Sequence, residues 1–227
     1  MTTGDGIVSQ YAELRREMVE QIARHAQLAS GETGIVSLSE TVMEVMNAVP
    51  RHEFVPVELR AFAYSDSPLP IGFDKTISQP FIVALMTDLL DLQPTDRVLD
   101  VGTGLGYQAA ILAKLVERVY TVEILEELAE GARRRLADQG TINVELRVGD
   151  GSNGWPEHSP FDKILVAAAP DLIPTPLLSQ LKPGGKMVIP AGIEDAQQLM
   201  LVEKNEKGQL NVREILPVRF SSMVVSH

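Results

Sequence analysis

The sequence contains no cysteine, which excludes disulfide bonds, thiolate nucleophiles and thiolate metal sites. Its four histidines are widely spaced and match no metal-binding motif: His25, His52, His158 and His227. No apolar run approaches the roughly 18 residues that a membrane-spanning helix needs. The first residues also lack the basic and apolar regions of a signal peptide. From these absences we expect no metal, no membrane association and a cytoplasmic location.

Basic side chains are also in short supply. Lys and Arg total 20 against 31 Asp and Glu, which gives a net charge of -11. A surface with this excess of negative charge repels nucleic-acid phosphates and anionic lipids. The one basic run, residues 133–135, follows acidic residues on the same predicted helix, so ion pairing on a solvated helix face explains it. Nucleic acid is therefore not an expected partner.

The beginning of the chain is predicted to be helical. Apolar residues recur at helical spacing over residues 11–29, which predicts an amphipathic helix. Ser37 and Glu40 have the spacing of a capping box at the start of a second helix, which Pro50 ends. Residues 64–80 are rich in proline and glycine and have almost no periodicity, so they predict a structured loop.

Further along the chain, short apolar runs alternate with helical patterns, as in a parallel sheet with helices on its faces. The expected strands are residues 97–101, 119–123, 144–148, 161–168 and 186–190. The expected helices are residues 81–90, 107–115 and 125–139. A turn is expected at 182–185, and a hairpin signal at 204–208 separates two last strands, 199–202 and 212–218.

These elements predict an α/β fold. Its sheet is doubly wound and mostly parallel, with an antiparallel C-terminal hairpin and an N-terminal helical appendage. We expect two units: residues 1–75 form the helical region and loop, and residues 76–227 form the domain that binds the ligand.

The residues at the carboxyl ends of the first three strands are acidic or glycine. Ligands of doubly wound sheets bind beyond these ends. Asp100 is followed by Gly102, Gly104 and Gly106, which allow a tight turn and let a ligand lie against bare backbone. A dinucleotide motif would place its last glycine where Tyr107 stands. The pattern therefore disfavours NAD.

Glu123 and the pair Asp150 and Gly151 end the next two strands. Glu123 can accept hydrogen bonds from both hydroxyls of a ribose. Asp150 can accept one from an adenine amino group, while Gly151 lets the base lie flat. Each signal alone has a simpler explanation, because glycine turns are common and a strand-terminal Asp often caps a helix. In this order and at this spacing they predict an adenosyl cofactor.

These motifs resemble the cofactor motifs of class I S-adenosylmethionine-dependent methyltransferases. Further segments resemble the protein-L-isoaspartate O-methyltransferase family in particular: residues 50–56, 63–64, 68–72, 76–80, 106–108, 149–151, 168–170 and 218–220. The most specific is 76–80, Thr-Ile-Ser-Gln-Pro, which general methyltransferases do not share. Leu105 departs from the small Ser that the family often has. The resemblance covers roughly residues 35–220.

The resemblance implies a Rossmann-like class I methyltransferase fold, S-adenosyl-L-methionine as cofactor and S-adenosyl-L-homocysteine as its product. The acceptor it implies is the free α-carboxyl of L-isoaspartyl residues in damaged proteins and peptides, with D-aspartyl residues left open. Ser78 is the implied catalytic residue, although its place just before Pro80 also suits a helix cap. The expected cofactor-binding residues are Thr76, Ile77, Asp100, Gly102, Thr103, Gly104, Gly106, Glu123, Asp150 and Gly151.

Two other functions stay open from the residues alone. A methyltransferase for a small molecule would share the fold and the cofactor motifs, but its acceptor pocket would be closed and apolar. A non-catalytic adenosyl-binding module is the second alternative, and the retained glycines, Glu123, Asp150 and Ser78 argue against it. The sequence does not define the oligomeric state or the role of residues 1–35.

Overall fold

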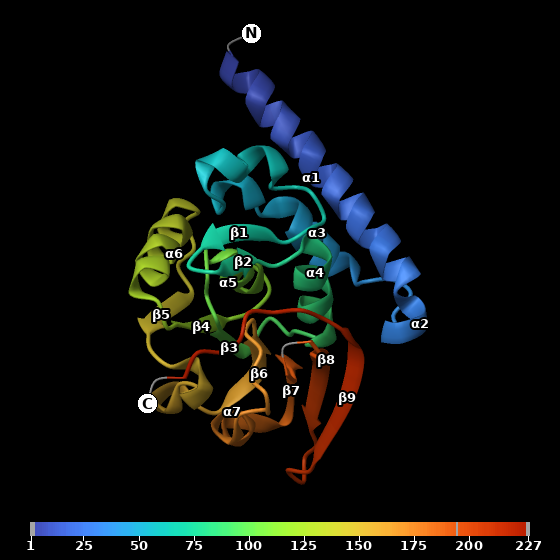
Figure 1. Ribbon diagram of the computed structural model, residues 1–227, viewed down its shortest axis with the longest axis vertical. Helices are drawn as coiled ribbons and strands as arrows, with labels where there is room; N and C mark the ends of the chain where they lie inside the picture. Colours follow the sequence, from blue (N-terminus) through green and yellow to red (C-terminus); the bar gives the residue numbers. More distant parts are fainter. Residues whose placement is uncertain (1–2, 194, 226–227) are drawn as a thin grey trace.

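A seven-stranded sheet forms the centre of the protein, whose computed structural model describes residues 3–193 and 195–225 (Figure 1). Its strand order is β5-β4-β3-β6-β7-β8-β9. The bounds are β3 (Arg97–Val101), β4 (Arg118–Glu123), β5 (Val144–Val148), β6 (Phe161–Val166), β7 (Leu181–Ala191), β8 (Gln198–Lys204) and β9 (Leu210–Pro217). Strands β3 to β7 pair in parallel, whereas β8 and β9 pair antiparallel. The predicted mostly parallel sheet and its C-terminal antiparallel hairpin are confirmed.

Each face of the sheet carries its own apolar cluster, because successive side chains of a strand point to opposite faces. In β3, Val98 belongs to one cluster and Leu99 to the other, and both are fully buried. Helices α4 (Pro80–Leu89), α5 (Tyr107–Ala113) and α6 (Glu126–Asp138) contribute to the first cluster. Helix α7 (Thr175–Gln180), which the sequence did not predict, contributes to the second. The sheet is therefore wound with helices on both faces.

The N-terminal region packs onto the first of these clusters. It consists of α1 (Thr3–Leu28), α2 (Ser30–Thr33), α3 (Glu40–Ala48) and the 3-10 turns η1 (Arg51–Glu53) and η2 (Val57–Phe62). Met18 and Ile22 of α1 are fully buried in the same cluster as α4. The beginning of α1 extends past the rest of the protein (Figure 1). The division of the chain at residue 75 stays a prediction.

The capping box expected at Ser37 and Glu40 was wrong. Glu40 is the first residue of α3, and the capping residue is Ser39, whose hydroxyl accepts a hydrogen bond from the Val42 amide. Leu38 is buried in the apolar cluster, so the chain enters the core before the helix begins. The observed cap therefore lies two residues beyond the expected one.

The segment 64–80, expected to be a loop, contains a short antiparallel hairpin of β1 (Leu69–Gly72) and β2 (Lys75–Ile77). Buried and exposed residues alternate along β1, but the strand is too short for this alternation to stand out among the prolines. At the tip, Phe73 and Asp74 both have φ of 54°. Two residues of positive φ suit a tight hairpin turn.

The turn expected at residues 182–185 is instead an irregularity inside β7. Leu181 pairs with Phe161, and the next pairing joins Lys186 to Lys163. The extra residues of β7 are accommodated as a bulge, where Gly184 has φ of 77°. The predicted turn was therefore wrong: these residues interrupt the register of one strand and do not separate it from another element.

Candidate functional site

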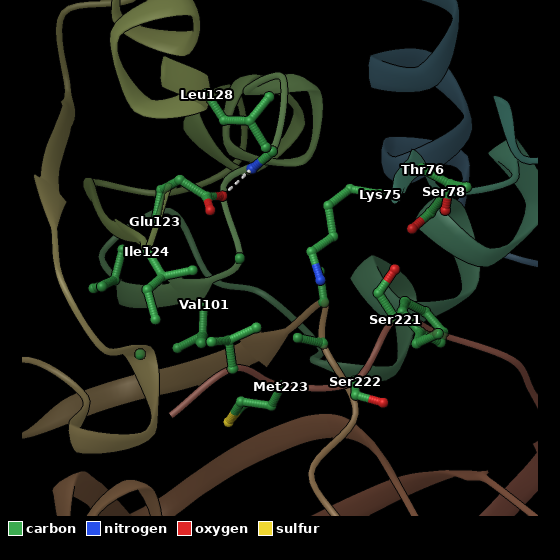
Figure 2. Close-up of a pocket in the computed structure, with 18 of the residues that line it drawn as sticks. Lys75, Thr76, Ser78, Val101, Glu123, Ile124, Leu128, Ser221, Ser222 and Met223 are labelled. Atoms are coloured by element: carbon green, nitrogen blue, oxygen red, sulfur yellow. Dashed lines mark hydrogen bonds between the residues drawn. The ribbon is translucent and has the colours of Figure 1, made fainter. Parts of the chain in front are cut away.

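A pocket lies at the carboxyl ends of the parallel strands (Figure 2). Its floor comes from the ends of β3, β4 and β6, and β3 lies between β4 and β6 in the sheet. This is the point where strand order reverses, and doubly wound folds bind their ligands there.

The far wall of the pocket combines the β1–β2 hairpin with the C-terminal segment 220–224. The Ala169 amide donates a hydrogen bond of 2.9 Å to the Ser221 carbonyl, and the Met223 amide donates one of 2.8 Å to the Ala169 carbonyl. The buried Gln197 side chain accepts from the Phe220 amide at 2.6 Å and donates to the Phe220 carbonyl at 3.1 Å. These bonds hold the segment against the rest of the pocket.

Glu123 lines the pocket at the end of β4 and is only 6% exposed. One carboxylate oxygen accepts a hydrogen bond from the Gly104 amide at 2.8 Å (Figure 2). The other accepts from the Leu125 amide at 3.1 Å. Each oxygen keeps a second lone pair. The two amides therefore orient a carboxylate that can still accept two hydroxyl protons, as the predicted ribose contact requires.

Asp100 lies beneath the pocket and not in its lining. It is fully buried, and burial raises the pKa of its carboxyl group to about 7. The Thr121 hydroxyl donates to Asp100 at 2.7 Å, so the Thr103 hydroxyl must donate to Thr121 across their 2.6 Å contact. This chain of hydroxyls holds the glycine loop of β3 onto β4. Thr103, like Asp100, is absent from the pocket lining in the described chain.

The three glycines of the loop have different surroundings. Gly102 and Gly104 line the pocket with φ of 92° and 55°. Gly106 has φ of 91° and faces α6, where an added Cβ would lie 3.4 Å from side-chain atoms of Ala132 and Leu136. The first two glycines therefore give a ligand access to backbone, whereas Gly106 permits the loop to pack closely against a helix.

Gly151 lies in the pocket floor beside β3, whereas Asp150 precedes it and does not line the pocket in the described chain. The Asp150 carboxylate caps η3 (Gly151–Asn153) by accepting from the amide and the hydroxyl of Ser152, so the capping alternative holds for this residue. Gly151 lines the pocket, and an added Cβ would come within 2.4 Å of Val101 Cγ1. Only glycine fits there without movement. The adenine contact of Asp150 stays a prediction.

Ser78 lies where the pocket meets a second groove. Thr76, Ser78 and Phe220 line both, and the groove continues between α1, α4 and the residues that follow β9. Ile77 instead points into the apolar cluster and is 7% exposed. Of the predicted site residues, Thr76, Ser78, Gly102, Gly104, Glu123 and Gly151 come together in the pocket lining.

The capping interpretation of Ser78 was wrong. Gln79 occupies the N-cap position of α4 but its side chain makes no capping hydrogen bond. The Phe81 amide instead donates a hydrogen bond of 2.8 Å to the Asp66 carboxylate. A carboxylate from the preceding loop thus supplies the cap. The Ser78 hydroxyl makes no hydrogen bond within the part of the chain that the structure describes, so it is free to contact a substrate.

Arg51 is a site residue that the sequence did not single out. Its guanidinium is fully buried and donates to the Ala63 carbonyl at 2.9 Å and to the Ser78 carbonyl at 2.7 Å. It also lies 4.9 Å from the centre of the Tyr107 ring. Burial lowers the pKa of Arg51 to about 10. Arg51 fixes the backbone of Ser78 through this bond, and its signal in the sequence was its place in the family-like segment 50–56.

The residues of the far wall were also missed. Lys75, Ser221, Ser222 and Met223 line the pocket (Figure 2), but no periodicity or motif spacing identifies them. Within residues 3–193 and 195–225, no group of three or more His, Asp or Glu side chains is placed to hold a metal ion. His227 lies outside the described residues. No described helix is both long and apolar enough to cross a bilayer.

Comparisons with known proteins identify a family. The sequence profile of the family "Protein-L-isoaspartate(D-aspartate) O-methyltransferase" matches residues 25–227. Protein-L-isoaspartate O-methyltransferase 1 of Polaromonas sp. (strain JS666) is 60% identical over 211 residues, which are 93% of this chain and 89% of that protein.

Two solved structures share the fold. One protein-L-isoaspartate O-methyltransferase superposes with a TM-score of 0.78 at 28% identity, over 92% of this chain and 65% of that one. A putative protein-L-isoaspartate O-methyltransferase from Plasmodium falciparum, solved with S-adenosyl-L-homocysteine, superposes with a TM-score of 0.76 at 23% identity. The match covers 92% of this chain and 98% of that one. With the profile match over most of its length, the chain belongs to the protein-L-isoaspartate(D-aspartate) O-methyltransferase family.

Proposed function

We propose that this protein transfers a methyl group from S-adenosyl-L-methionine to the free α-carboxyl of L-isoaspartyl residues in damaged proteins, and so begins their repair. The observation that carries the proposal is the place of Ser78, which lines both a pocket suited to the cofactor and a groove suited to a peptide. Family membership supports the reaction.

The residues present in the pocket fit the cofactor. Glu123 presents oriented carboxylate lone pairs for the ribose hydroxyls, and Gly102 and Gly104 offer bare backbone. Gly151 leaves room for a flat base over the floor. When bound, S-adenosyl-L-methionine supplies an electrophilic methyl group on its sulfonium. The pocket would hold this group at the end where Ser78 opens to the groove.

The acceptor requires little chemical activation. A carboxyl group with a pKa of about 4 is already ionised at neutral pH, so no general base is needed. What remains is alignment of the carboxylate with the methyl group, and orientation alone can lower such a barrier by about 7 to 11 kcal/mol. The Ser78 hydroxyl would donate a hydrogen bond to the acceptor and hold it. Arg51 fixes the Ser78 backbone and thereby the direction of this hydroxyl.

The shape of the second groove favours a peptide over a small acceptor. His25 of α1, Gln79 and the exposed Arg219 place polar groups along it, and the exposed Pro217 adds apolar surface. A closed apolar cavity, expected for a small-molecule methyltransferase, would not combine surface residues from three such distant segments. An extended chain carrying an isoaspartyl residue can lie across the groove with its carboxylate at Ser78.

A pair of matched peptides tests the proposal. The protein is incubated with S-adenosyl-L-methionine labelled in its methyl group and with peptides that differ only in an isoaspartyl or an aspartyl residue. We expect one methyl group on the isoaspartyl peptide, seen by mass spectrometry, followed by spontaneous loss of methanol to a succinimide. Equal methylation of both peptides, or methylation of neither, would contradict the proposed acceptor. A D-aspartyl peptide in the same assay decides whether this second acceptor is used.

The remaining features of the proposal concern partners and location. The net charge of -11 supports the exclusion of nucleic acid, since phosphate backbones would be repelled. A cytoplasmic location is proposed on the sequence alone. A filter-binding experiment with DNA and RNA at low salt checks the first point, because retention of either nucleic acid would contradict it.

A further inference from the structure

Lys75 places an unpaired positive charge inside the cofactor pocket. It is the first residue of β2, directly after the turn formed by Phe73 and Asp74. In Figure 2 its side chain extends away from Ser78 and ends in the middle of the pocket. The ammonium group makes no ion pair or hydrogen bond with any residue of the described chain, although the side chain is half-buried. An unpaired cation in this position can bind an anionic group of a ligand.

The other charged residue in the described lining is Glu123, and it does not neutralise Lys75. Both Glu123 oxygens accept hydrogen bonds from backbone amides, those of Gly104 and Leu125. The remaining lining is apolar or carries hydroxyl and backbone groups. A ligand with a carboxylate would therefore find one cationic partner in this pocket, and a half-buried pair is screened less by salt than one on the surface.

We propose that Lys75 binds the carboxylate of the amino-acid portion of S-adenosyl-L-methionine and of S-adenosyl-L-homocysteine. The inference rests on use of this cofactor and not on the identity of the acceptor. Lys75 acts here in binding, because the cofactor carboxylate has the same charge before and after transfer. Its contact is equal in the ground state and the transition state, and contacts of this kind change affinity without changing the chemical step.

The acceptor carboxylate is the other anion that reaches this site, and the chemistry argues against it. Its charge disappears as the ester forms. A cation beside it would stabilise the reactants more than the transition state and would slow the transfer. The Lys75 side chain also extends away from Ser78, whereas the acceptor groove opens at Ser78 (Figure 2).

The test compares two ligands and two variants by calorimetry. S-adenosyl-L-homocysteine carries the carboxylate, and 5'-methylthioadenosine keeps the adenosine and the sulfur but has no amino-acid portion. Lys75→Met removes the charge with little change in length. Lys207→Met is the matched control, since Lys207 is exposed on the β8–β9 turn. We expect Lys75→Met to weaken S-adenosyl-L-homocysteine about tenfold and to leave methylthioadenosine unchanged, while Lys207→Met changes neither affinity.

Three outcomes would overturn the inference. Equal weakening of both ligands would place Lys75 at the adenosine end or in support of the hairpin. Unchanged affinity for both would remove it from cofactor binding. A raised KM for the isoaspartyl peptide with unchanged S-adenosyl-L-homocysteine affinity would assign it to the acceptor. Because the binding measurements use no acceptor, they stand even if the proposed methyl acceptor is wrong.

Discussion

The buried guanidinium of Arg51 donates a hydrogen bond of 2.7 Å to the backbone carbonyl of Ser78. A second bond, to the Ala63 carbonyl, ties the same group to the loop before the hairpin. Replacing Arg51 with Met leaves the Ala63 and Ser78 carbonyls without this donor, and bonds to charged groups contribute about 1.5 to 3 kcal/mol each. We expect Arg51→Met to lower the free energy of unfolding by about 3 kcal/mol or more, measured by urea denaturation.

Arg51→Lys gives the matched comparison, because an ammonium group can reach one carbonyl but not both in the same geometry. Its stability should lie between those of the wild type and Arg51→Met. Methyl transfer per folded molecule should fall in both variants, since Ser78 loses its fixed backbone. Wild-type stability in Arg51→Met would contradict the role assigned to the guanidinium.

Ser78 and Asp66 separate catalysis from helix capping. We expect Ser78→Ala to lower methyl transfer by at least about tenfold with little change in melting temperature, because the cap of α4 comes from Asp66. Asp66→Ala should cost about 1 kcal/mol of stability, the usual contribution of a side-chain cap. Transfer rates per folded molecule and thermal melts of both variants check the pair. Destabilisation of Ser78→Ala with normal turnover would restore the capping interpretation.

Glu123 should determine cofactor affinity. Replacing Glu123 with Ala removes both acceptors offered to the ribose and releases the Gly104 and Leu125 amides. We expect affinity for S-adenosyl-L-homocysteine to weaken by about 1.5 to 3 kcal/mol, measured by calorimetry. Glu130→Ala is a control, since Glu130 is exposed on α6. Equal affinities of the two variants would count against the ribose contact.

Gly151 and Val101 are expected to be energetically coupled. A Cβ at residue 151 would lie 2.4 Å from Val101 Cγ1, so Gly151→Ala should destabilise the protein by about 1 to 3 kcal/mol. Val101→Ala removes the methyl group that causes the clash. In a double-mutant cycle, the combined variant should therefore be more stable than the sum of the two single changes implies. Strict additivity would mean that the strand end moves aside freely.

Asp100 should make stability depend on pH. Its folded pKa of about 7 lies above its ordinary value of 3.8, so between these values the folded state binds the proton more tightly than the unfolded chain. Stability then falls as pH rises through this window, by at most about 1.4 kcal/mol per pH unit, and levels off above pH 7. Asp100→Asn lacks this titration. From pH 5 to pH 8, the unfolding free energy of the wild type should fall relative to that of Asp100→Asn. Parallel curves of unfolding free energy against pH would contradict the raised pKa.

The central sheet was predictable because each strand carries a local sequence signal of its own. Runs such as residues 97–101 and 144–148 are bounded by turn residues, and β3 and β5 have these bounds. Glu123 and Gly151 were found because parallel strands deliver their last residues to one edge of the sheet. For these residues the position in the sheet follows from the position at the end of a strand. The spacing of the strands along the chain was therefore enough to predict that they lie in one site.

The far wall could not be predicted in this way. Ser221 and Met223 are held at the pocket by hydrogen bonds with the Ala169 backbone and by the hydrogen bonds between the Gln197 side chain and the Phe220 backbone. These partners lie far away in sequence, and nothing in the periodicity of residues 220–224 reports them. Lys75 depends likewise on a short hairpin whose alternation is hidden by prolines. Such positions follow from tertiary contacts and become visible only in the folded chain.

The C-terminal wall gives the pocket an order of assembly. All of the floor is translated before residue 169, whereas residues 220–224 are the last part of the lining to be made. A nascent chain can therefore form the parallel strands and the glycine loop while one side of the pocket is still missing. Ligand binding stabilises only a state that can bind. Stabilisation by the cofactor thus becomes available to this protein only after synthesis has passed its final wall segment, and the earlier stages of folding must proceed without it.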